Sequence, residues 1–261
     1  RRITELAQRY RDSVLTVFTL PASLGEPMEH LRQRCGELAF VWLGRGAADR
    51  AQAEDYLRRL NELRPQFPDM ELLFGVELGL MDYLAPRLRE YVRRWDFDLV
   101  IGSSHLVDGV DPYYPEYFAQ HGDYNGILRY FESILANIAA FDDFDVYGHL
   151  DYVVRYSGAK NYRPADYADI LDEILKKLIS MGKGIELNTA GLKYGLGFAH
   201  PHPEVLRRYR ELGGEIITVG SDGHKSEHYA WEFGAAEEIL KAAGFMHYTV
   251  FRKRKPEFVK L

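Results

Sequence analysis

Short apolar runs rich in β-branched residues alternate along the chain with amphipathic segments of helical periodicity. The apolar runs predict strands at Val14–Leu20, Leu38–Leu43, Glu71–Val76, Asp98–Gly102, Asp145–Gly148, Gly184–Leu187, Glu215–Val219 and Met246–Phe251. The amphipathic segments predict helices at Pro27–Cys35, Ala53–Arg64, Leu84–Arg94, Tyr124–Phe141, Pro164–Met181, Glu204–Leu212 and His228–Ala243. Strands that alternate with helices usually pair in parallel. Seven or eight such units predict a closed (β/α) barrel, and an open doubly wound sheet is the alternative.

Composition narrows the class of protein. No linker rich in Pro, Gly or Ser divides the 261 residues, so we expect a single domain over residues 1–261. Hydrophobic residues make up 46% and charged residues 28%, which excludes a disordered or collagen-like protein. The net charge of −6 argues against nucleic-acid binding. No apolar run reaches the roughly 20 residues that span a bilayer, and the single cysteine, Cys35, favours a cytoplasmic location.

Ionisable and amide side chains follow one predicted strand after another. In a parallel barrel the carboxyl ends of the strands open into one mouth, where catalytic residues collect. Five successive predicted strands deliver such residues there: Glu77, His105, His149, Asn188, and the pair Asp222 and His224. One histidine after one strand would be an ordinary structural residue, but a series of this kind predicts a functional site.

The residue types at these positions indicate metal chemistry. Carboxylates and imidazoles together suit Zn, Mn or Fe better than Ca or Mg, which prefer oxygen ligands. Carboxylates can bridge two ions while imidazoles occupy terminal positions, and paired metals can clamp the oxygens of a phosphoryl group. The residues alone therefore suggest metal-assisted hydrolysis.

Several cations and histidines near the same strand ends are less specific. Arg155 follows His149 closely and would suit a phosphate ligand, whereas Lys193 and Lys225 are equally well explained as solvated loop charges. The sequence His200-Pro-His202 resembles a metal-binding pair, but we expect it to be structural, because its prolines restrict the geometry.

Two further features have structural interpretations. Glu186 alternates with Ile185 and Leu187, so we expect it on the opposite face of its strand in a structural pair. The tyrosine-rich segment Tyr113–Tyr130 is either a lid over the mouth or a packed crossover.

At these residues the sequence resembles the polymerase-and-histidinol-phosphatase (PHP) superfamily, and within it the histidinol-phosphatases. The matching segments are Gly75–Gly79, Ser103–His105, Tyr147–Asp151, Gly184–Thr189 and Gly213–Lys225. The likeness extends from about residue 54 to the C-terminus, and the last segment is the most specific. The resemblance implies a distorted (β/α)7 TIM-like barrel with two or three divalent metals, Zn, Mn or Fe, at its mouth.

The resemblance also implies a role for each matching residue. Glu77 would bridge two metals, and His105 and His149 would complete the second metal site. Asp222 would bind the first metal, and His224 the third. Either Asp222 or His224 could assist proton transfer to the leaving group.

Two more matching residues would contact the substrate or its surroundings. Arg155 would hold the substrate phosphate, and Asn188 would lie beside the substrate or behind the metal ligands. The implied substrate is a small phosphomonoester such as L-histidinol phosphate, and neither nucleic acid nor membrane is an expected partner. The sequence gives no indication of the oligomeric state.

The N-terminal segment 1–53 departs from the family pattern. Family members have His-x-His at the end of the first strand and a histidine after the second. The best-matching positions here are Glu5, Ala7 and Leu43, so part of the shell of the first and third metals is missing. The chain is a degenerate member with fewer metals, its N-terminal sequence is altered, or this register is wrong.

The leading interpretation is a metal-dependent phosphomonoesterase that acts on L-histidinol phosphate. The first alternative is a degenerate barrel that binds metal or phosphate with little turnover, which the missing histidines favour. The second is a phosphoesterase of the same superfamily with another substrate.

Overall fold

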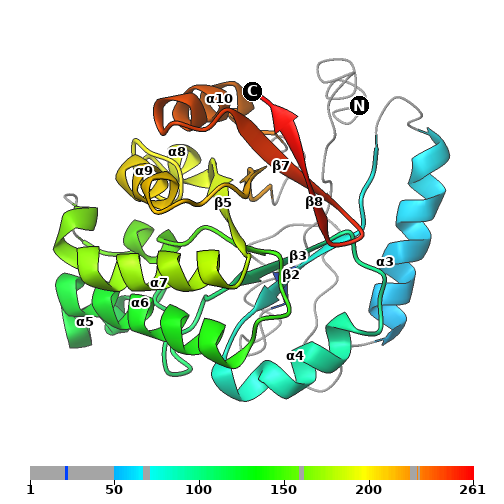
Figure 1. Ribbon diagram of the computed structural model, residues 1–261. Helices are drawn as coiled ribbons and strands as arrows, with labels where there is room; N and C mark the ends of the chain where they lie inside the picture. Colours follow the sequence, from blue (N-terminus) through cyan, green and yellow to red (C-terminus); the bar gives the residue numbers. More distant parts are fainter. Residues whose placement is uncertain (1–20, 23–49, 67–70, 159–161, 224–227, 229) are drawn as a thin grey trace.

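A computed structural model describes residues 21–22, 50–66, 71–158, 162–223, 228 and 230–261. Its main feature is a six-stranded sheet surrounded by helices (Figure 1). The strands are β1 (Pro21–Ala22), β2 (Gly75–Gly79), β3 (Leu99–Ser103), β4 (Val146–Tyr147), β5 (Gly184–Asn188) and β6 (Ile217–Gly220). The predicted elements Val14–Leu20, Pro27–Cys35 and Leu38–Leu43 lie outside the described residues.

The strands of this sheet are all parallel and follow one another in chain order, from β1 to β6. In a doubly wound sheet the strand order reverses at a switch point. No reversal occurs among the described strands, so the structure favours the predicted barrel over the doubly wound alternative.

Helices return the chain from each strand to the next. They are α3 (Arg50–Leu63), α4 (Ala85–Val92), α5 (Pro115–His121), α6 (Asp123–Ala140), α7 (Ala168–Ser180), α8 (Ala190–Lys193), α9 (Pro203–Glu211) and α10 (Phe233–Ala242). Short 3-10 turns lie at η1 (Arg64–Gln66), η2 (Asp82–Leu84), η3 (Tyr152–Arg155) and η4 (Pro164–Tyr167). No helix in the described part of the chain is both long and apolar enough to cross a bilayer.

The main apolar core lies between the sheet and these helices. In α6 the fully buried residues Ile127, Tyr130, Phe131, Ile134 and Ile138 recur at helical spacing, so one face of the helix packs inward. Of the segment Tyr113–Tyr130, the part within α6 packs inward through Ile127 and Tyr130, whereas Tyr113 and Tyr124 are exposed.

The last predicted strand does not form another parallel unit. It is β7 (His247–Arg252), which pairs antiparallel with β8 (Lys255–Lys260). The two residues between them, Lys253 and Arg254, have φ angles of +50° and +63°. Such a two-residue turn matches the twist of a hairpin, so the chain reverses at once.

This hairpin covers the end of the sheet at which the strands begin. The backbone N–H groups of Lys253 and Arg254 donate to Asp98, the residue before β3. Phe251 packs in a second apolar cluster with Leu99 and Val146. The opposite ends of the strands are left for the polar residues.

Several predicted boundaries differ from the observed ones. The second described strand begins at Gly75 and not at Glu71, because Glu71 is exposed and pairs with Arg252. Glu77 therefore lies within β2 and not after it. The last predicted helix begins at Phe233, after a left-handed residue at Glu232 (φ +53°).

Candidate metal and phosphate site

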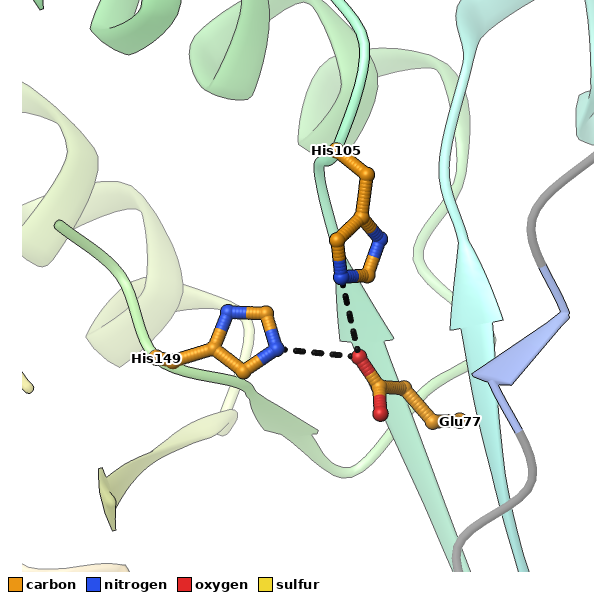
Figure 2. Close-up of side chains that lie close together, drawn as sticks. All are labelled: Glu77, His105 and His149. Carbon is orange, nitrogen blue, oxygen red and sulfur yellow. Dashed lines mark hydrogen bonds and ion pairs between the residues drawn. The ribbon is translucent and has the colours of Figure 1, made fainter. Parts of the chain in front are cut away.

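Three metal-type side chains converge at the carboxyl ends of β2, β3 and β4. Glu77 lies in β2, His105 two residues beyond β3, and His149 two residues beyond β4. One ligand atom from each lies within 4.8 Å of the others. Both imidazoles point toward the same carboxylate (Figure 2). The structure thus brings these three predicted residues together.

The two imidazoles contact the same carboxylate oxygen. Nε2 of His149 lies 3.0 Å from Oε1 of Glu77, and Nε2 of His105 lies 3.6 Å from it. The hydroxyl of Ser103 donates to the same oxygen at 2.7 Å. Sequence reasoning did not single out Ser103, although it belongs to the matching Ser-Ser-His segment.

Burial and pairing set the charges of the cluster. Burial would raise the pKa of Glu77, but the hydrogen bond with His149 and the charges of both imidazoles lower it to about 2. Burial would lower the pKa of His149, but the bond with Glu77 raises it to about 9. Burial lowers the pKa of His105 to about 4. Near neutral pH one proton therefore joins Glu77 and His149, and His105 is neutral.

The donor set fits a divalent transition metal. One carboxylate and two imidazoles are borderline ligands of the kind that Zn, Mn and Fe accept. Metal binding would replace the proton that His149 now carries, because only the neutral imidazole can ligate. Nδ1 of His149 is buried and has no partner in the described part of the chain.

Arg155 lies beside this cluster, at the end of η3. Its guanidinium carbon lies 4.3 Å from the ring centroid of Tyr152, 5.1 Å from Tyr156 and 4.8 Å from Tyr194. Its Nη1 lies 3.9 Å from Oδ2 of Asp222, and its side chain is 11% exposed. The tyrosines hold a planar, mostly buried cation close to the mouth.

Two other predicted residues meet near Arg155. Asp222 lies two residues beyond β6 with a left-handed φ of +44°. Lys193, at the end of α8, donates from Nζ to the backbone oxygen of Asp222 at 3.1 Å. The structure thus places Asp222 between two cations, outside the three-residue donor cluster of the described residues.

Asn188 is engaged in contacts within the protein. Its amide nitrogen donates to Oε2 of Glu186 at 3.0 Å, and its amide oxygen accepts from the backbone N–H of Ala190 at 2.9 Å. Glu186 also accepts from the backbone N–H of His149 at 3.1 Å. Glu186 therefore makes the structural pair that its place in the strand predicts, and its partner is a residue of the site.

The two histidines of the His-Pro-His sequence have structural contacts. Nδ1 of His200 lies 2.6 Å from Oδ1 of Asp151, and both side chains are fully buried. The backbone N–H of His202 donates to the other oxygen of Asp151, and its ring caps α9 through the N–H of Glu204. Neither histidine joins the three-residue cluster.

Several predicted positions lie outside the described residues. They are His224 and Lys225 after β6, and Glu5, Ala7 and Leu43 in the N-terminal segment.

Comparison with known proteins identifies a family. A family model described as the PHP domain matches residues 5–190. The match includes the N-terminal segment in which the sequence departs most from the pattern.

Relatives of this chain carry the name histidinol-phosphatase or probable histidinol-phosphatase. The chain is 29% identical over 210 residues to the histidinol-phosphatase of Lactococcus lactis subsp. lactis, covering 77% of this chain and 76% of the relative. It is 32% identical over 179 residues to a probable histidinol-phosphatase of Thermotoga maritima, covering 60% of this chain and 71% of the relative.

Solved structures of other proteins share the fold. One of them is histidinol phosphate phosphatase from Lactococcus lactis subsp. lactis in complex with zinc, L-histidinol and phosphate. The TM-score is 0.73 at 22% identity, over 94% of this chain and 100% of that one. The shared fold supports the predicted α/β class, a TIM-like barrel.

Proposed function

The chain belongs to the PHP domain family, and from this premise we propose that it is a metal-dependent phosphomonoesterase. Its proposed reaction is the hydrolysis of L-histidinol phosphate to L-histidinol and phosphate. Relatives that bear the name histidinol-phosphatase support this substrate. The observation that carries the proposal is the buried cluster of Glu77, His105 and His149 with the cation Arg155 beside it.

Glu77, His105 and His149 would hold one divalent metal, the second of the two or three that the family resemblance implies. Its donors suit Zn, Mn or Fe. A divalent ion there supplies a Lewis acid for a phosphoryl oxygen and lowers the pKa of a water molecule. Asp222 would bind the first metal of this set and His224 the third. Fewer ions than this are expected if Glu5 and Ala7 truly stand where the family has histidines.

Arg155 would bind the phosphate of the substrate. Its guanidinium is nearly buried, and its Nε is buried without a partner among the described residues. A buried planar cation presents donors in a fixed fork, which suits phosphate oxygens. The contact would become more favourable as negative charge spreads over the phosphoryl group in the transition state.

The leaving alkoxide must receive a proton. Asp222 and His224 both follow β6, so either could supply it from the mouth. Asn188 already donates one amide hydrogen to Glu186 and accepts a hydrogen bond from Ala190. It could therefore contact the substrate only through its second amide hydrogen.

We also propose that residues 1–261 form a single domain and that the protein is cytoplasmic. The continuous parallel sheet supports the first proposal. The single cysteine and the biosynthetic role that the names of the relatives imply support the second.

The missing N-terminal histidines favour one competing function, a degenerate barrel that binds metal or phosphate with little turnover. A phosphoesterase with another substrate is the second. Elemental analysis of the purified protein, followed by phosphate release from a panel of phosphomonoesters, separates the three. Metal with preferential release from L-histidinol phosphate supports the proposal, metal without turnover supports the degenerate barrel, and preference for another ester supports the third.

A further inference from the structure

Glu186 is a buried carboxylate in the wall of the barrel. It lies in the middle of β5, with 6% of its surface exposed. Its Oε2 accepts two hydrogen bonds, from the backbone N–H of His149 at 3.1 Å and from the amide of Asn188 at 3.0 Å. An ionisable side chain is costly to bury, and Glu186 is buried beside the three-residue cluster without belonging to it.

The backbone of His149 accounts for this burial. His149 has a φ angle of +27°, which is uncommon for a residue with a side chain. The preceding residue, Gly148, still donates to Gly102 of β3, but His149 turns out of the sheet. Its N–H therefore needs another acceptor, and Glu186 provides it across from the neighbouring strand.

The backbone of His149 is fixed on both sides. Its carbonyl accepts from the N–H of Tyr152 at 2.8 Å, at the start of η3, while its N–H is held by Glu186. With both peptide groups held, the direction of the Cα–Cβ bond is set. This direction takes Nε2 to within 3.0 Å of Glu77.

The neighbouring strand β6 makes room for the carboxylate. A Cβ atom built on Gly220 would lie 2.0 Å from Oε1 of Glu186, closer than any real contact. Glycine at this position therefore lets Glu186 occupy the space beside β6. The position of the carboxylate is built into two strands, β5 and β6.

We propose that Glu186 is a positioning residue that holds the backbone of His149 in its left-handed conformation and so aims the imidazole at the metal site. Its contribution is the hydrogen-bond acceptor at Oε2, not its negative charge. This inference rests on the proposed metal site and assigns Glu186 no contact with metal or substrate.

The variants Glu186→Gln and Glu186→Ala distinguish the effect of the hydrogen-bond acceptor from the effect of the negative charge. Glutamine can keep an oxygen at the Oε2 position, with its NH2 beside Gly220, whereas alanine removes the acceptor. Affinity for Co²⁺ is measured by calorimetry, and the visible spectrum of the bound ion reports its ligand geometry. Glu186→Ala should weaken binding by about 10–100-fold and alter the spectrum, as loss of a partner behind a ligand does. Glu186→Gln should stay within about threefold of the parent.

Asp145 provides a matched control at the other end of the barrel. It is also a buried carboxylate that accepts from a backbone N–H, that of Val100, at 2.8 Å. Asp145→Ala should lower the melting temperature but leave Co²⁺ affinity unchanged. If Glu186→Ala does not fold, Glu186→Asp, which withdraws the acceptor by one methylene, should show the same loss of affinity with a smaller loss of stability.

Two outcomes would overturn the inference. One is parental affinity in Glu186→Ala. The other is an equal loss in Glu186→Gln and Glu186→Ala, which would assign the effect to charge.

A parent that binds no Co²⁺ would refute the proposed metal site but not the role of Glu186. In that case NMR of the histidine imidazoles in the metal-free protein tests the role of Glu186. The ring signal that His149→Gln removes should shift in Glu186→Ala and keep its parental position in Glu186→Gln. No shift in Glu186→Ala would overturn the inference.

Discussion

Nε2 of His149 lies 3.0 Å from Oε1 of Glu77, although their strands are not neighbours in the sheet. Strand β3 lies between β2 and β4, and adjacent strands are about 4.8 Å apart. The two side chains therefore reach toward each other across β3, and the left-handed turn at His149 directs the imidazole (φ +27°). Because β3 also delivers His105, the same geometry brings three donors together.

Replacing His149 should weaken metal binding. His149→Ala removes one of three donors, so affinity should fall by at least about 100-fold, since the loss of an outer partner already costs about 10–100-fold. Elemental analysis and calorimetry with Zn²⁺ would measure the loss. His247, which is exposed on β7, is a matched control, and His247→Ala should bind metal as the parent does. Equal metal content in the two variants would contradict the assignment.

Metal binding should release a proton. His149 has a pKa of about 9 in the metal-free protein and must be neutral to ligate. Between pH 6 and 8 the apparent affinity should therefore rise about tenfold per pH unit. Calorimetry in buffers of different ionisation enthalpy should count about one proton released at pH 7. An affinity independent of pH over this range would show that His149 is already neutral without metal.

The same proton should link the stability of the metal-free protein to pH. The folded pKa of His149 lies above its unfolded value of about 6.5. Its contribution is therefore complete below about pH 6.5 and is lost as the pH rises toward 9. Urea unfolding of metal-free parent and His149→Gln should show a stability difference that narrows over this range. A difference that widens with pH would reverse the sign and contradict the pairing.

Arg155→Lys should impair catalysis without affecting metal binding. Lysine keeps the charge but lacks the fork of donors that binds two phosphate oxygens. Loss of a charge-assisted contact costs about 1–3 kcal/mol, so kcat/KM should fall about 5- to 150-fold. Arg163→Lys, at an exposed arginine paired with Asp166, should leave kcat/KM unchanged. Parental activity in Arg155→Lys would place the phosphate elsewhere.

Restoring the N-terminal histidines should strengthen the centre. The double variant Glu5→His and Ala7→His would supply the imidazoles that the family pattern has on the first strand. If the site is degenerate in the proposed register, both metal stoichiometry and phosphatase turnover should increase. If the parent protein already binds two or three metals and has high phosphatase turnover, other residues supply the ligands.

The sequence alone determined the order of elements and the place of most site residues. The alternation of apolar runs and amphipathic helices predicted β2 to β6. A strand buried on both faces appears as a continuous apolar run, and a helix buried on one face has apolar residues at helical spacing. The polar residues at the strand ends break that pattern, so Glu77, His105 and His149 stand out from the sequence alone. Their chemical types then indicate a metal.

The tertiary structure decided which polar groups act on one another. The alternation in β5 placed Glu186 opposite Ile185 and Leu187 but could not show that its acceptor meets His149, 37 residues away. The bond depends on a left-handed turn and on the space beside Gly220, and neither follows from a local pattern. The pairing of β7 also could not be predicted from the sequence, because its pattern of apolar residues resembles that of a parallel strand. Its antiparallel pairing is set by the turn at Lys253 and Arg254 and by its contacts with Asp98, which arise only when distant segments pack together.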